Sequence, residues 1–113
     1  MVARLTSAII VTSLTRRAFL LGGSAAILVK GDQAAGDIMI IMREKGLVSG
    51  LWERALAPSG DYLWMRNEQQ DIEKKYVFAQ YLDRRRARDP DLWVIELDVP
   101  NAERFTADIN EMN

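Results

Sequence analysis

Four short apolar segments lie between residues 24 and 66, with turn residues between them, and this run limits the fold more than any other feature. The intervening stretches contain Gly, Asp, Pro or Ser, which favour turns. Consecutive short strands favour an antiparallel sheet with helices on one face. The first two segments, joined by a turn at 31–36, are expected to form a hairpin. The four predicted strands span 24–30, 37–44, 47–56 and 62–66.

A helix is predicted before the first strand. Thr6 or Ser7 is suited to cap its start, and the pair Gly22-Gly23 supplies its stop. Apolar residues recur along it at helical spacing, which indicates one buried face. That stripe comprises Ile10, Val11, Leu14, Ala18 and Leu21.

A second helix is predicted from residue 67 or 68 to residue 88. Asp89-Pro90 ends it, because the residue before a proline avoids the helical conformation. Asp91 is expected to accept hydrogen bonds from backbone donors of the turn that follows. The stripe expected to be buried on this helix comprises Ile72, Tyr76, Ala79 and Leu82.

The last predicted strand spans 92–99, and its alternation should bury Trp93 together with Ile95, Leu97 and Val99. Residues 100–113 are expected to be either a mobile polar tail or a short helix over 102–109. The whole chain, 1–113, is therefore predicted to be a single α+β domain. It has a four- to five-stranded, mainly antiparallel sheet and two packed helices, in the order α-β-β-β-β-α-β.

The chain contains neither His nor Cys. Their absence excludes a Ser-His-Asp triad, a Cys-His dyad and a metal site held by cysteine. An enzyme built from this chain would depend on carboxylates, Lys, Arg, Tyr or a bound ion, so catalysis is not favoured. The 15 basic and 16 acidic side chains give a net charge of −1, which predicts no bulk attraction to nucleic acid or to anionic membranes.

The pair Arg16-Arg17, followed by an apolar stretch, is similar to a twin-arginine export signal. The apolar residues before the pair and the lack of a small-x-small cleavage site near Asp32 and Gln33 argue against this interpretation. The stretch is also shorter than the roughly 20 residues that a membrane span requires. We expect the pair to lie in the first helix of a cytoplasmic protein.

Three blocks of sequence carry a family resemblance. They are Arg4-Leu5-Thr6 with Arg16-Arg17, the turn from Gly31-Asp32 to Gly36, and Asp89-Pro90-Asp91-Leu92-Trp93-Val94 followed by Glu96. Together they resemble a family of short, mostly alphaproteobacterial proteins known as domain of unknown function 1491. The resemblance covers about residues 3–99, and 46–67 departs most from it. It implies that the arginine pair lies within the first helix, and it implies no activity, cofactor or catalytic residue.

A carboxylate group near the last strand is the best candidate metal site. Asp91, Glu96 and Asp98, with Asp89 nearby, offer the oxygen ligands that Mg²⁺ prefers, and Glu96 and Asp98 share one strand face. Metal-dependent nucleases with such a pattern have a Lys two residues after the acid, where this chain has Asp98. A helix stop followed by a half-solvated strand explains the same residues and is preferred.

Four arginines at the end of the second helix, Arg84, Arg85, Arg86 and Arg88, are the candidate contact for nucleic acid or phosphate. Cations also suit a helix C-terminus, and neighbouring aspartates partly neutralise them, so a solvated helix end is preferred. Three tryptophans offer either a stacking platform or core packing, and core packing is the simpler explanation. These are Trp52, Trp64 and Trp93.

The sequence therefore favours a non-enzymatic cytoplasmic binding or accessory domain, with no cofactor and no catalytic residues. Contact with nucleic acid or phosphate through 84–88 is the second hypothesis, and a carboxylate-metal hydrolase is the third. The expected partner is another protein, with a homodimer as an open alternative, and no membrane partner is expected.

Overall fold

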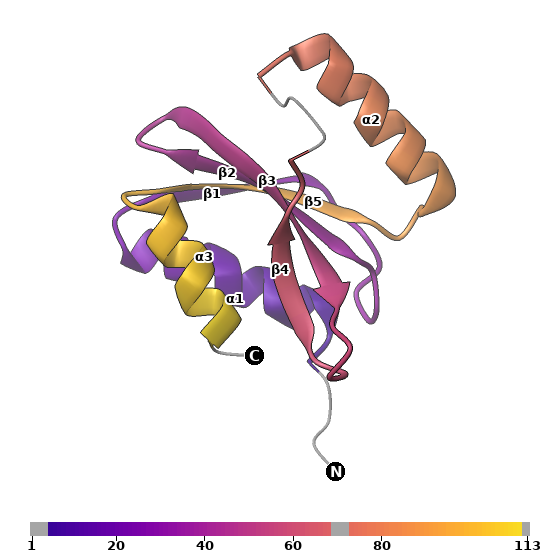
Figure 1. Ribbon diagram of the computed structural model, residues 1–113, viewed down its shortest axis with the longest axis horizontal. Helices are drawn as coiled ribbons and strands as arrows, with labels where there is room; N and C mark the ends of the chain where they lie inside the picture. Colours follow the sequence, from indigo (N-terminus) through magenta and orange to yellow (C-terminus); the bar gives the residue numbers. More distant parts are fainter. Residues whose placement is uncertain (1–4, 69–72, 112–113) are drawn as a thin grey trace.

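Five strands and three helices build the part of the chain that this computed structural model describes, residues 5–68 and 73–111 (Figure 1). The predicted order of elements is confirmed from the first helix to the last strand, and a third helix follows. In chain order the elements are α1 (Ser7–Leu20), β1 (Ser24–Val29), β2 (Ile38–Glu44), β3 (Leu47–Leu56), β4 (Tyr62–Arg66), α2 (Lys75–Arg88), β5 (Trp93–Val99) and α3 (Ala102–Glu111).

The sheet has the strand order β1-β5-β2-β3-β4 and is mixed. β5 runs parallel to β2, and the other three pairings are antiparallel. The hairpin expected from the first two strands is wrong, because β5 lies between β1 and β2. The turn between those strands bonds elsewhere: the N–H of Asp32 donates to the carbonyl of Asp91 over 3.0 Å. The carbonyls of Gln33 and Ala34 accept from the first residues of α1.

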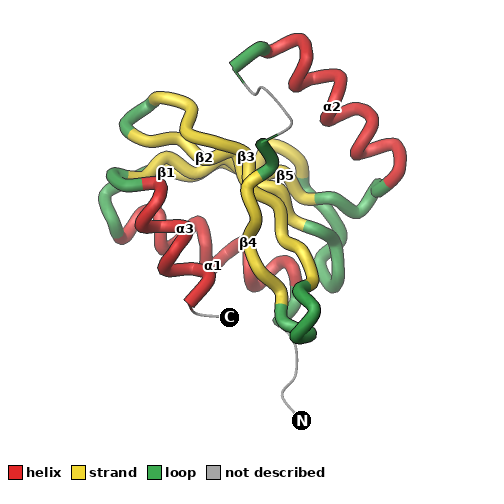
Figure 2. The backbone as a smooth tube through the Cα atoms, viewed as in Figure 1, coloured by secondary structure: helices red, strands yellow, loops and turns green. Residues whose placement is uncertain are grey.

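Helices cover both faces of the sheet, so the expectation of helices on one face is wrong (Figure 2). α1 and α3 pack on one face, over the larger cluster of buried apolar residues. On the opposite face lies a smaller cluster that includes Met39 and Val94, and Phe78, Tyr81 and Leu82 of α2 pack against it.

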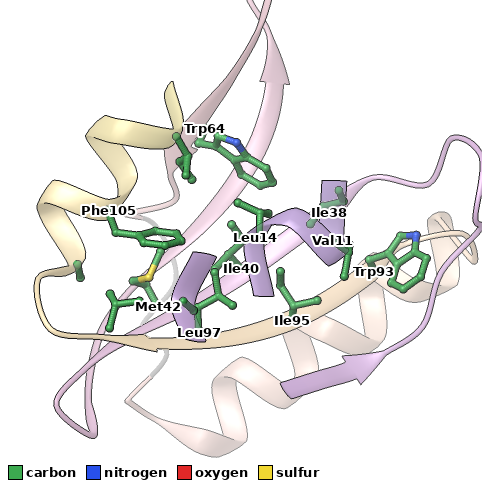
Figure 3. Packing of buried hydrophobic residues seen from close by; sticks show 14 residues of the cluster. Val11, Leu14, Ile38, Ile40, Met42, Trp64, Trp93, Ile95, Leu97 and Phe105 are labelled. Atoms are coloured by element: carbon green, nitrogen blue, oxygen red, sulfur yellow. The ribbon is translucent and has the colours of Figure 1, made fainter. Parts of the chain in front are cut away.

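The central strand β5 shows why this arrangement forms. Trp93, Ile95 and Leu97 alternate toward α1 and α3 and are at most 3% exposed (Figure 3). Val94 points to the opposite face and is also buried. A strand covered on both faces is expected to read as a continuous apolar run, which holds here from Trp93 to Ile95, before Glu96 and Asp98 restore the alternation. The predicted core role of Trp93 is confirmed.

Helix α1 begins where the sequence predicts. The hydroxyl of Thr6 caps it by accepting from the N–H of Ile9, and Gly22 follows its end with a φ of 84°. Leu14 and Ala18 are buried as expected. Leu21 is 49% exposed, so its place in the buried stripe is wrong. It is the C-cap residue, beyond the last helical turn, where the helical spacing no longer sets the direction of the side chain.

Helix α2 starts at Lys75, later than expected, and its predicted buried stripe is wrong at Tyr76 and Ala79, whereas Leu82 packs against the smaller apolar cluster as expected. Tyr76 is 76% exposed, Ala79 is exposed, and Ile72 lies outside the described residues. No residue of α2 is fully buried. Helix α2 contains few apolar residues, so the helical periodicity of the sequence does not indicate which face of the helix packs on the sheet.

The expectation of a mobile tail after residue 100 is wrong for 102–111, and the alternative of a short helix is confirmed. The side chain of Asn101 accepts from the N–H of Arg104 and so caps α3. Phe105 and Ile109 are buried against the sheet. Among the described residues, none of the helices has the length and apolar character needed to cross a bilayer.

Candidate functional site

Two of the three sequence blocks of the family resemblance, the 31–36 turn and the segment from Asp89 to Glu96, meet around Trp93. The indole N–H of Trp93 donates to the carbonyl of Asp32 over 2.7 Å, and its backbone N–H donates to the carbonyl of Asp37 over 2.8 Å. The hydroxyl of Ser7, next to the first block, donates to the carbonyl of Gly36 over 2.6 Å. These bonds tie the start of α1, the 31–36 turn and β5 together in a structural joint.

Glycine is required in this joint at position 36. A Cβ there would collide with the carbonyl oxygen of Asp91 and would press on the Trp93 ring. The turn after α2 is closed by Asp89, whose carboxylate accepts from the N–H of Asp91 over 3.1 Å. The role expected for the Asp91 side chain in this turn is therefore taken by Asp89.

The candidate metal residues are each placed differently. Asp91 is exposed in the turn. Glu96 makes an ion pair with Arg43 at 3.2 Å, and Asp98 accepts from the N–H of Gly46 over 2.9 Å. Glu96 and Asp98 share the sheet face that the alternation predicts. Within residues 5–68 and 73–111, no group of three or more acidic side chains has the arrangement of a metal site.

The arginines at the end of α2 divide into two kinds. Arg84, Arg86 and Arg88 are exposed. Arg85 instead turns toward the sheet and pairs with Glu53 of β3 at 3.0 Å, and its side chain is only 16% exposed. One of the four candidate residues is thus engaged in holding α2 in place.

Glu53 is the centre of a small polar network beneath α2. Its carboxylate accepts from the hydroxyl of Tyr81 over 2.8 Å and from the amide of Asn67 over 2.9 Å, besides the pair with Arg85. Burial raises the pKa of Tyr81, and the hydrogen bond to Glu53 and its negative charge raise that pKa further. These polar contacts hold α2 against β3, because the helix itself buries few apolar side chains.

A cavity of about 330 Å³ opens between α1, α3 and β4. This volume falls at the lower end of the range of roughly 300–1,000 Å³ typical of small-molecule pockets. Most of the lining is apolar, and its polar part is confined to Ser13, Arg16 and Arg17. The apolar lining residues are Leu5, Ile10, Leu14, Leu20, Trp64 and Ile109.

The deep side of this pocket belongs to the core. Leu14, Trp64 and Ile109 are 4–6% exposed and come from three different elements. Figure 3 shows the Trp64 ring projecting from β4 toward Leu14. Core packing fixes these three side chains, so the apolar floor is preformed.

The open side carries the positive charge. Arg16 and Ser13 are exposed, while Arg17 is half-buried and lies 3.9 Å from the carboxylate of Asp108. Asp108 is shared with Arg104 at 3.8 Å. Asp108 therefore lies near two guanidinium groups, those of Arg17 and Arg104, and Arg16 adds a further positive charge to the lining of the pocket.

Sequence reasoning found part of this pocket. Arg16 and Arg17 stood out as a pair and were assigned to α1, where they lie. Trp64 was expected in the core, which the structure confirms. Ile109 lies in the segment for which the sequence allowed either a mobile tail or a short helix. Its spacing from Phe105 on one face of α3 was the signal that could have revealed it.

Comparison with known families agrees with the resemblance drawn from the three blocks. A family model described as "Protein of unknown function (DUF1491)" matches residues 5–107. No curated protein matches the chain.

Three solved structures have a similar fold. A crystal structure of a DUF1491 family protein from Caulobacter crescentus CB15 is 29% identical, with a TM-score of 0.75, covering 90% of this chain and 94% of that one. An NMR structure of a DUF1491 family protein from the same organism is 28% identical, with a TM-score of 0.74 and coverage of 93% and 94%. A solution structure of a protein from A. tumefaciens is 28% identical, with a TM-score of 0.74 and coverage of 92% and 93%.

Proposed function

Because this chain belongs to the DUF1491 family, whose function is unknown, we propose its function from the geometry of its pocket. The protein is a non-enzymatic binding domain, and its ligand is a small amphipathic anion with an apolar body and one acidic group. The observation that supports this is the combination of a preformed apolar floor at Trp64 with two guanidinium groups at the mouth.

The charge at the mouth selects the acidic group. A guanidinium is planar, stays charged at all physiological pH values and binds carboxylates in a bidentate manner. Arg16 and Arg17 are adjacent on α1 and both line the cavity. If the acidic group of the ligand lies at the mouth, the apolar chain or ring of the ligand lies over Leu14 and Trp64. This contact buries apolar surface of the ligand and so favours binding.

Calorimetric titration with decanoate tests the proposal, with decanol as the uncharged probe. Decanoate should bind, and decanol should bind more weakly. Arg16→Gln and Arg17→Gln should each weaken decanoate binding by roughly 10- to 100-fold, the value of a hydrogen bond to a charged group. Arg86→Gln, on the exposed side of α2, is the matched control and should leave binding unchanged. Equal binding of decanoate by the wild type and both pocket variants would contradict the proposal.

The protein is further proposed to act in the cytoplasm with its N-terminal region intact. In support, α1 supplies Val11, Leu14 and Ala18 to the core, and β1 follows directly in the sheet. Cleavage near residue 30, as an export signal would require, would remove both elements. Mass spectrometry of the protein from its native host should find residues 1–30 present, and a periplasmic species without them would contradict this.

A further inference from the structure

The two edges of the sheet differ in how far their backbone hydrogen-bonding groups are covered. At one edge, β4 has its backbone covered at Trp64, where the side chain of Asn110 both donates and accepts a hydrogen bond. At the other edge, β1 has β5 as its one neighbouring strand. In the described part of the chain, residues 24–29 have no capping side chain comparable to Asn110.

The composition of β1 is unusual for an edge strand. Its sequence, SAAILV, carries no charge and no proline, which are two of the usual means of protecting an edge. Ile27 is 52% exposed and Leu28 is 50% exposed. The register with β5 shifts between Ile27 and Val29, which leaves 24–27 as the regular run. An apolar edge of this kind is a template for pairing with another strand.

The helix above this edge adds apolar surface. α1 lies over β1 and β5. Its pocket-lining residues face α3 and β4, so at 100° per residue Thr15 and Phe19 lie on the opposite flank of the helix. Phe19 is 59% exposed. We take the free edge of β1, together with the exposed Phe19 of the helix that packs on it, as one apolar surface.

We propose that this surface is a homodimer interface, in which β1 pairs with β1 of a second copy in antiparallel orientation and the two sheets become one. A two-fold axis through Ala26 sets Ala26 opposite Ala26 of the other copy, with side chains of both copies on the same face of the joined sheet, and this small residue allows close approach. The same surface patch is used twice, as a two-fold axis requires.

The charges near β1 fit this orientation. Lys30 is the single charged residue between positions 22 and 31. A parallel pair would set the two lysines side by side, whereas the antiparallel pair moves them to opposite ends. There each Lys30 lies opposite Gly22 of the other copy, next to the C-cap residue of α1, where the helix dipole favours a cation.

The mass in solution tests the proposal. Sedimentation equilibrium of the wild-type chain at submillimolar concentration should give twice the 12.8 kDa chain mass. Ala26→Lys places like charges across the new strand pair and should weaken the dimer by roughly tenfold or more. Met65→Lys, at an exposed position on the opposite edge strand, is the matched control and should remain dimeric.

A second measurement keeps the test valid if Ala26→Lys does not fold. Amide hydrogen exchange within residues 24–27 of the wild type should slow as protein concentration rises, while exchange in β4 should not change. A monomeric wild type, or a dimer broken by Met65→Lys and not by Ala26→Lys, would overturn the proposal. So would a wild type that stays monomeric but pairs through β1 with a strand of a different protein.

Discussion

The side-chain amide of Asn110 makes both backbone hydrogen bonds of Trp64 that a neighbouring strand would make. The N–H of Trp64 donates to Oδ1 of Asn110 over 2.7 Å, and Nδ2 of Asn110 donates to the carbonyl of Trp64 over 3.1 Å. One residue of α3 thus closes the middle of the β4 edge. It also fixes the strand position that carries the floor of the pocket.

Replacement of Asn110 should destabilise the fold and expose this edge. Asn110→Ala leaves two backbone groups of β4 without their partners, which should lower the free energy of unfolding by about 1–3 kcal/mol. Urea denaturation measures the change. Glu111→Ala, at the exposed next position, is the control and should change stability by less than about 0.5 kcal/mol. Equal stability of the two variants would contradict the role of Asn110.

The joint around Trp93 should be among the most sensitive parts of the molecule. Trp93→Ala removes a ring that is 3% exposed and should cost about 3–5 kcal/mol, or prevent folding. Trp93→Phe retains much of the apolar volume but loses the hydrogen bond to Asp32, so about 1–3 kcal/mol should be lost. Thermal and urea melts compare them with Asp98→Asn, which keeps an oxygen acceptor for Gly46 and should be nearly neutral. A fully stable Trp93→Ala would refute the core role.

Docking of α2 should weaken at alkaline pH. The pKa of Tyr81 is raised in the folded state above its ordinary value of 10.0, chiefly by burial and then by Glu53. A raised pKa means that the folded protein holds this proton more tightly. Its stabilising contribution is therefore complete below pH 10.0 and is lost as pH rises toward the folded-state pKa.

The variant Tyr81→Phe isolates this effect, because it cannot ionise. Urea melts from about pH 8 to about pH 11 should show a steeper loss of stability in the wild type than in the variant. Parallel pH profiles for the two proteins would show that Tyr81 does not contribute.

The basic end of α2 should not bind nucleic acid tightly. Arg85 is committed to Glu53, and the net charge of the chain is −1. We expect no micromolar binding of duplex DNA or RNA at physiological salt. Binding that falls steeply with salt and is lost in the Arg84→Glu, Arg86→Glu double variant would prove this expectation wrong.

Local patterns predicted the elements well where one residue type decides the local conformation. Thr6 marks the start of α1, and Asp89-Pro90 marks the end of α2, as expected. The alternation from Trp93 to Val99 placed the core face of β5 correctly. These features depend on a few adjacent residues, so they could be predicted from the sequence alone.

Pairing between distant segments was not predictable in the same way. The 31–36 turn suggested a hairpin, but its backbone is bound by Ser7, Ala8 and Asp91, which are remote in sequence. That binding leaves room for β5 between β1 and β2. The pocket has the same origin: Arg16, Trp64 and Ile109 come from three elements that only the tertiary fold brings together.

An NMR titration of ¹⁵N-labelled protein with decanoate tests the central claim most directly, because it reports both binding and its location. The indole N–H signal of Trp64, assigned with Trp64→Phe, should shift together with the backbone amides of Arg17 and Ile109. The indole signal of Trp93, which lies outside the pocket lining, should stay in place. Saturable shifts confined to the pocket are the expected result. Unchanged spectra, or shifts centred on Trp93 or on α2, would contradict the proposed binding site.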